Sequence, residues 1–237
     1  MDHAFPFGLP GPTALYLSLY VLTLAVHAVL IGYVLAGSGY VAVTTVWPGR
    51  SRDVIRPLVK DWLPFVLGAA ITAGVAPLLF LQILYKESFY TANLLLFHRW
   101  MAVVPVLIVG FYALYLNKSA RVASWSPALR VAISAGAFLC FTFVAYSWTE
   151  NHLLALDRES WVQFYGDGDR FYTDGGLGPR FAMWLALAAP LMVMIAGWQV
   201  WARTGETDDD HACAARRLAT LAIGGLVLAA AAGYAVA

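Results

Sequence analysis

Three histidines and one arginine, in or beside apolar stretches, are the side chains that could bind a cofactor. His27 lies near the middle of the first apolar stretch, in LTLAVHAVLIG. An imidazole is costly to bury in hydrocarbon, so it usually has a partner or a function. A neutral imidazole offers one donor and one acceptor, and its free nitrogen can ligate a haem iron. His27 is therefore a candidate axial ligand of haem, and a hydrogen bond to a neighbouring helix is the alternative.

His98 and Arg99 form a second candidate, in LLLFHRWMAVVP. His98 could also ligate iron, and Arg99 could bind a haem propionate because a guanidinium matches a carboxylate. The alternative is an interfacial pair that anchors the helix in the headgroups. At 1.5 Å per residue, the depths of His27 and His98 differ by about 8 Å. One shared haem, two haems, or a single ligated histidine all remain open.

Three further residues could serve electron transfer at the same end of the predicted helices. His152 follows the fourth apolar run beside Glu150, and it could ligate a second haem close to a soluble electron carrier. A histidine that simply faces solvent is the alternative. Gln82 and Tyr85 end the second run and could hydrogen-bond a quinone head group, although helix ends are often amphipathic for no functional reason.

The composition indicates a membrane protein. Of the 237 residues, 61% are hydrophobic and 12% are charged, whereas a soluble domain usually has about 25% charged residues. A net charge of +1 argues against nucleic acid as a partner. The two cysteines, Cys140 and Cys213, are too far apart to suggest an iron–sulfur or zinc site, and the absence of CxxCH excludes covalent c-type haem.

Six apolar runs are long enough to span a bilayer, for which about 20 residues are needed. The sequence therefore predicts an all-α fold, a single transmembrane domain over residues 1–237 with a larger loop over 150–179. The expected helices are 13–37, 62–85, 89–116, 127–149, 180–202 and 217–236.

Lysine and arginine are concentrated in the loops at one end of these helices, and acidic residues at the other. Because cytoplasmic loops carry the excess of basic residues, the basic end is predicted to be cytoplasmic and both termini extracytoplasmic. The predicted location is the inner (cytoplasmic) membrane. Gly225, Ala229 and Gly233 recur every four residues in the last run. Such spacing favours close helix packing, either within the chain or against another subunit.

Residues 15–115 resemble the N-terminal region of cytochrome bd-type quinol oxidase subunit I and its relatives. Leu22 to His27 resembles the opening helix of that family, in which the matching histidine ligates a high-spin haem. The stretches GAAITAGVAPLLFLQ and FYTANLLLFHRWMAV resemble its second helix and the start of its third. Unlike the family, the chain has no acidic residue over 90–117 and no long quinol-binding loop. The resemblance thus implies an electron-transfer relative rather than a complete oxidase.

Together these features predict an integral membrane b-type cytochrome subunit. It would transfer electrons between a membrane quinol and an extracytoplasmic redox protein such as a c-type cytochrome, within a larger complex of membrane subunits in contact with lipid. The protein would supply ligands and orientation, and haem b the redox chemistry. The alternative is a haem-free anchor or scaffold subunit, which the short loops and the lack of acidic residues within the predicted helices favour.

Overall fold

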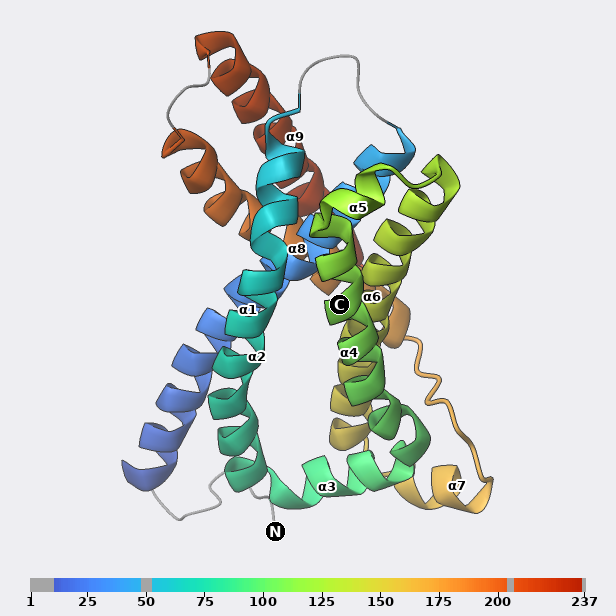
Figure 1. Cartoon of the computed structure of the whole chain (residues 1–237). Helices are drawn as coiled ribbons and strands as arrows, with labels where there is room; N and C mark the ends of the chain where they lie inside the picture. Colours follow the sequence, from blue (N-terminus) through green and yellow to red (C-terminus); the bar gives the residue numbers. More distant parts are fainter. Residues whose placement is uncertain (1–10, 48–52, 204–206, 236–237) are drawn as a thin grey trace.

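The structure is a computed structural model that describes residues 11–47, 53–203 and 207–235 (Figure 1). Its described part is all-helical, and six helices are long and apolar enough to cross a membrane, which confirms the predicted class of polytopic membrane protein. These six are α1 (Gly11–Val46), α2 (Ile55–Leu84), α4 (Phe97–Lys118), α6 (Pro127–Leu156), α8 (Leu177–Trp201) and α9 (Asp208–Tyr234). Three short helices accompany them: α3 (Lys86–Leu95), α5 (Ala120–Ala123) and α7 (Trp161–Gly166).

Helix α1 continues well beyond the predicted end at residue 37. Gly37 and Gly39, which could have ended it, lie inside the helix. A Cβ at Gly37 would lie 3.0 Å from Val59 Cγ1, and a Cβ at Gly39 would lie 3.0 Å from Phe138 Cε2. Both glycines therefore serve close packing, against α2 and α6 respectively, and the helix has no reason to stop at them.

Helices α2 and α9 both begin before their apolar parts do. Helix α2 starts at Ile55 rather than 62, because Asp53 Oδ1 accepts hydrogen bonds from the first backbone N–H groups of the helix, 3.0 Å from Ile55 N. Helix α9 starts at Asp208 rather than 217, with the side chain of Thr207 as its N-cap. Hydropathy finds the part of a helix that lies in lipid, whereas the cap determines where the helix begins.

The third predicted helix, 89–116, is two helices separated at Leu96. Helix α3 is amphipathic and buries Ser88, Phe89 and Ala92 on one face. It runs across the end of the bundle instead of along it, linking the α1–α2 pair to the α4–α6 pair (Figure 1). The spanning part therefore starts at Phe97, so His98 and Arg99 lie in the first turn of α4.

Helix α6 extends to Leu156 instead of ending at 149, and this takes the first seven residues of the predicted loop 150–179 into the helix. Glu150 and His152 are thus helical residues. The remaining loop contains α7 and rejoins the bundle at Leu177, where α8 begins. The prediction that the helices lack acidic residues is wrong at this point, because Glu150 is fully buried within α6.

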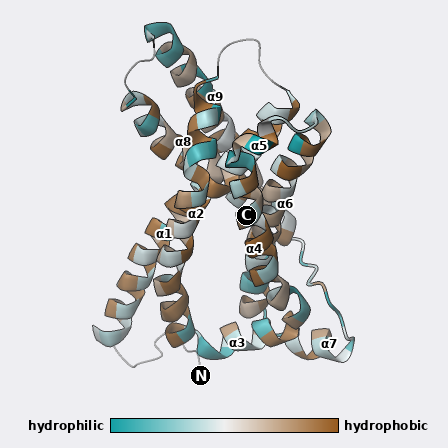
Figure 2. Cartoon of the chain, in the orientation of Figure 1, coloured by the Kyte–Doolittle hydropathy of each residue, from teal (hydrophilic) through white to brown (hydrophobic). Residues whose placement is uncertain are grey.

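Two apolar cores hold the helices together. The larger one lies towards the basic end and includes Tyr33, Val59, Phe141, Met192 and Leu218, from α1, α2, α6, α8 and α9. The smaller one lies at the opposite end, which we call the outer end, and joins α3, α6, α7 and the start of α8. Apolar residues cover the lengths of the long helices and polar ones gather at their ends and on α3 (Figure 2).

The small-residue stripe of α9 packs within the chain. A Cβ at Gly225 would lie 2.7 Å from the backbone oxygen of Ala186 and 2.9 Å from Pro190 Cδ, so α8 and α9 approach closely at this point. Gly225 and Ala229 are both buried. Of the two expected uses of the stripe, the internal one is therefore observed for Gly225.

Candidate cofactor site

His27 lies in the contact between α1 and α2. Its Nδ1 is 2.9 Å from the backbone oxygen of Ala70, on α2. Because a carbonyl oxygen can only accept a hydrogen bond, Nδ1 carries the proton in this contact. The neutral ring then keeps a lone pair on Nε2. Histidines that ligate metals usually have this arrangement, with one ring nitrogen donating to a carbonyl and the other free to bind.

Gly74 creates the space that this contact needs. A Cβ on Gly74 would lie 2.7 Å from His27 Cε1 and 3.0 Å from Nδ1, closer than real side-chain contacts allow. The imidazole therefore sits against bare backbone one turn along α2 from Ala70. His27 is half-buried, with its ring against α2.

His98 is exposed. Among the described residues, the aromatic ring that contacts its imidazole is that of the neighbouring Phe97, with ring centroids 5.7 Å apart. His98 lies in the first turn of α4, just after α3, and α3 begins where α2 ends. From Gly74, beside His27, to the end of α2 at Leu84 is about 15 Å along the helix. The two imidazoles thus lie at different depths, which disfavours one iron shared between them.

Arg99 has a protein anion as its partner. Its Nε lies 2.6 Å from Glu150 Oε2, and the side chains are 12% and 0% exposed. The sequence predicted a buried anion for this arginine and suggested a haem propionate. In the structure α6 supplies that anion, so Arg99 is already neutralised and no propionate is needed to explain it.

The loop after α6 closes over this ion pair. The backbone N–H of Tyr172 donates to Glu150 Oε1 at 3.0 Å. The Arg99 guanidinium lies over the rings of Tyr146 and Phe171, 5.1 and 4.9 Å from their centroids. Cation–π contacts of this kind stabilise a charge removed from water. Arg99, Glu150 and the loop therefore form one structural unit, which sequence reasoning missed because it placed Glu150 outside the helix.

Polar contacts fasten this loop and α3 to the end of α6. Asn151 Nδ2 donates to Asn93 Oδ1 at 2.7 Å, and Arg158 Nη2 donates to Ser88 Oγ at 2.9 Å. Trp161 Nε1 donates to the backbone oxygen of Leu154 at 2.7 Å. These bonds hold α3 and α7 in fixed positions across the outer end.

Asp157 is the acceptor at the start of the loop. The hydroxyls of Ser160 and Tyr172 both donate to its Oδ2, the latter at 2.8 Å. These two hydrogen bonds, the Ser160 one first, lower the pKa of the Asp157 carboxyl, because they favour its charged form. Burial, and then the bond to Asp157, raise the pKa of Tyr172, which keeps its proton and remains a donor.

The other candidates remain separate from His27. His152 is exposed on the last turns of α6. Gln82 is half-buried, and Tyr85 is 44% exposed beyond the end of α2. The structure therefore brings none of these residues into contact with His27. Among the described residues, no group of three or more His, Cys, Asp and Glu side chains could hold a metal ion.

The basic end holds a more open polar network. Asp53 accepts a hydrogen bond from Tyr40 Oη at 2.9 Å and forms an ion pair with Arg217 at 3.4 Å, which joins α1, α2 and α9. Arg56 Nη2 donates to Thr45 Oγ1 at 3.0 Å, a second link between α2 and α1. Farther along, Ser134 Oγ donates to Asn117 Oδ1 at 3.1 Å between α6 and α4.

No protein-family model, curated protein or solved structure matches this chain. Its function therefore has to be inferred from the geometry of its own residues.

Proposed function

We propose that this chain is a membrane-embedded b-type cytochrome subunit in which His27 is the axial ligand of one haem. It would transfer electrons between a membrane quinol and an extracytoplasmic carrier such as a c-type cytochrome, as part of a larger complex in the inner membrane. The contact between His27 Nδ1 and the Ala70 oxygen is the observation that carries the proposal.

Of the residues predicted to bind haem, His27 fits the role of iron ligand, whereas Arg99 does not fit the role of propionate partner. His27 has one nitrogen committed to a carbonyl and the other available, which is the donor state that iron requires. The Ala70 carbonyl and Gly74 fix the position of the ring, so the ligand would be oriented before haem binds. Arg99 does not fit as a propionate partner, because Glu150 neutralises it. Haem would supply one-electron redox chemistry, while the protein supplies ligand and burial.

His98 and His152 are weaker candidates in this scheme. Both are exposed at the outer end, where an extracytoplasmic redox partner would dock. Either could ligate a second haem if a partner subunit covers it. The low burial of all six spans leaves surface for either lipid or such partners, since no more than a third of each apolar window is buried within the chain.

The absorbance of purified protein tests the proposal. Wild type should show a reduced-minus-oxidised haem b spectrum, and His27→Ala should lose at least nine tenths of it. Gly74→Leu should also lose haem because its side chain would occupy the place of the imidazole. His98→Ala is the matched control on an exposed histidine and should retain the spectrum of the haem at His27. An unchanged spectrum in His27→Ala would refute the assignment.

A second candidate is a haem-free anchor subunit. The observation that favours it is the apolar surface left uncovered on α1, where Leu15, Val21, Leu22 and Val26 are all more than half exposed. Partner helices could cover such a face as readily as lipid can. Protein purified with its partners but without any Soret absorbance would select this candidate.

A further inference from the structure

Three cations from two helices come together at the basic end of the bundle. Arg56 and Lys60 are four residues apart and so lie on the same face of α2, and Arg130 is near the start of α6. Lys60 is close enough to both arginines for their charges to repel it, and the neighbouring Asp61 offsets part of that repulsion. All three cations are half-buried. The fold therefore gathers like charges where they disfavour one another.

Hydrogen bonds between α1, α2 and α6 fix the position of this cluster. Arg56 Nη2 donates to Thr45 Oγ1 at 3.0 Å, and Thr45 Oγ1 lies 3.5 Å from Ser134 Oγ. Ser134 Oγ donates to the backbone oxygen of Arg130 at 3.0 Å. Lys60, one turn beyond Arg56, lines a narrow recess together with Ser134. The cluster thus lies where α1, α2 and α6 meet.

The cluster lacks a counter-ion of its own. No carboxylate of the described residues forms an ion pair with Arg56, Lys60 or Arg130. Asp53, three residues before Arg56, forms its ion pair with Arg217 instead. Within the same part of the chain, Arg130 Nε has no hydrogen-bond partner. The positive ends of the α2 and α6 dipoles lie at this end as well, so the cluster favours an anion from outside the chain.

The general excess of basic residues at this end does not account for the cluster. Cytoplasmic loops of membrane proteins carry such an excess without any ligand. Arg121 and Arg216, at the same end, show the arrangement that this rule requires, because both are exposed to solvent. The rule gives no reason for three cations to be half-buried and close together.

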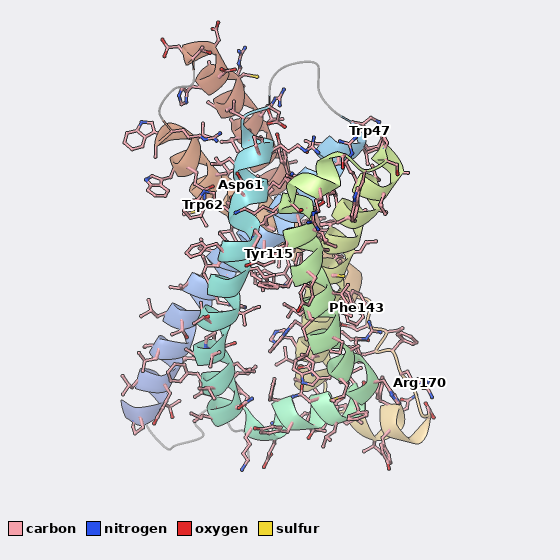
Figure 3. All side chains as sticks on the ribbon, in the orientation of Figure 1. Trp47, Asp61, Trp62, Tyr115, Phe143 and Arg170 are labelled. Carbon is pink, nitrogen blue, oxygen red and sulfur yellow. The ribbon has the colours of Figure 1, made fainter. Side chains whose placement is uncertain are left out.

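The surroundings of the cluster indicate which anion it takes. Lys118 Nζ donates to the backbone oxygen of Asp61 at 3.1 Å, so the end of α4 lies beside α2 here. Asp61 and Tyr115 mark this end of the two helices (Figure 3). Phe65 and Tyr115, farther into the spanning parts, are 67% and 51% exposed, which provides apolar surface for an acyl chain. Basic pockets between spanning helices typically bind acidic lipid head groups.

We propose that Arg56, Lys60 and Arg130 bind the phosphate group of one acidic phospholipid, such as phosphatidylglycerol. Guanidinium and ammonium groups are the side chains that suit phosphate oxygens. The recess beside Lys60 is too narrow for a head group, so the phosphate would contact the outer ends of the three side chains. This site is distinct from His27 and requires no haem.

Native mass spectrometry of the full chain in uncharged detergent tests the site, with phosphatidylglycerol as the probe. Wild type should bind one lipid saturably, and Lys60→Gln/Arg130→Gln should weaken that binding about thirtyfold. Arg121→Gln/Arg216→Gln is the matched control, because it removes the same charge from exposed positions at the same end. It should change the affinity less than about twofold. Equal weakening by both variants would mean general attraction to surface charge and would overturn the site.

Thermal unfolding distinguishes lost binding from lost folding. Because Lys60→Gln/Arg130→Gln removes repulsion between like charges, its Tm without lipid should equal or exceed that of wild type. Phosphatidylglycerol should raise the Tm of wild type and leave that of the variant nearly unchanged, since a ligand stabilises the folded form that binds it. A variant that melts below wild type without lipid would mean that these cations stabilise the fold themselves, and would overturn the proposal.

Soluble and uncharged probes distinguish the possible sources of the phosphate. Inorganic phosphate and glycerol phosphate should neither displace the lipid nor raise the Tm. Displacement by either compound would indicate a site for a soluble phosphate and would overturn the lipid assignment. Phosphatidylcholine carries no net charge and should bind more weakly than phosphatidylglycerol. Equal affinity for the two lipids would show that the cations do not recognise the charge, which would also overturn the proposal.

Discussion

The two ends of the bundle are held together by different kinds of interaction. At the basic end, several polar residues join α1, α2 and α9 through contacts that remain partly exposed, such as Asp53 with Arg217 at 16% and 29% exposure. At the outer end, one ion pair with a fully buried carboxylate joins α4 to α6 under a folded loop. Charge shared among several partners near water tolerates the loss of one contact, whereas a single buried pair does not.

The sharpest test of this comparison is to break the buried pair. Arg99→Leu leaves the Glu150 carboxylate buried without a counter-charge, and the free energy of unfolding should fall by about 3–5 kcal/mol. The double variant Arg99→Leu/Glu150→Leu should recover most of that loss, because no unpaired charge remains. Denaturation of each variant in mixed micelles measures both values. A double variant as unstable as the single one would mean that the pair itself stabilises the fold.

At the basic end, Asp53→Ala should have a smaller effect. It removes the cap of α2, the acceptor for Tyr40 and a partner of Arg217, and we expect a loss of about 1–2 kcal/mol. Asp61→Ala is the control, since its side chain is exposed and serves no cap of α2. The same micelle titration applies. A loss as large as that of Arg99→Leu would remove the distinction between the two ends.

The smallest effect is expected from pH at the outer loop. Because hydrogen bonds lower the pKa of Asp157 in the folded protein, its contribution is complete above its ordinary pKa of about 4. That contribution disappears as the pH falls through the lowered folded value. The difference in unfolding free energy between wild type and Asp157→Asn should thus stay below about 1 kcal/mol near pH 6. It should shrink towards zero as the pH falls through the lowered folded pKa, and a difference that grew on acidification would contradict this assignment.

Sequence reasoning identified the six spans because a run of about 20 apolar residues matches the thickness of the hydrocarbon core, and a soluble domain rarely contains one. It misplaced their ends where local contacts decide. The Asp53 cap, the packing of Gly37 against α2 and the amphipathic face of α3 all depend on residues that hydropathy does not weigh. The largest consequence came from predicting one helix over 89–116 where the structure has two, separated at Leu96. This break changed the depth assigned to His98.

For the candidate site, the sequence predicted which residue types would be involved but not which residues they would contact. A buried anion for Arg99 followed from the cost of an unpaired charge in lipid, but its identity depended on where α6 ended. The hydrogen bond from Tyr33 Oη to Gln199 Oε1 gave no sequence signal either, because its two residues are 166 positions apart along the chain. Long-range pairing of this kind is a property of the fold and not of any local pattern.

The bond from His27 to a main-chain oxygen has a consequence for how this protein can change over evolutionary time. The acceptor belongs to Ala70, but any residue at position 70 would present the same carbonyl. The constraint instead falls on position 74, where any side chain would displace the imidazole. In related chains we therefore expect positions 27 and 74 to change together, while position 70 is restricted only by its burial in the larger core.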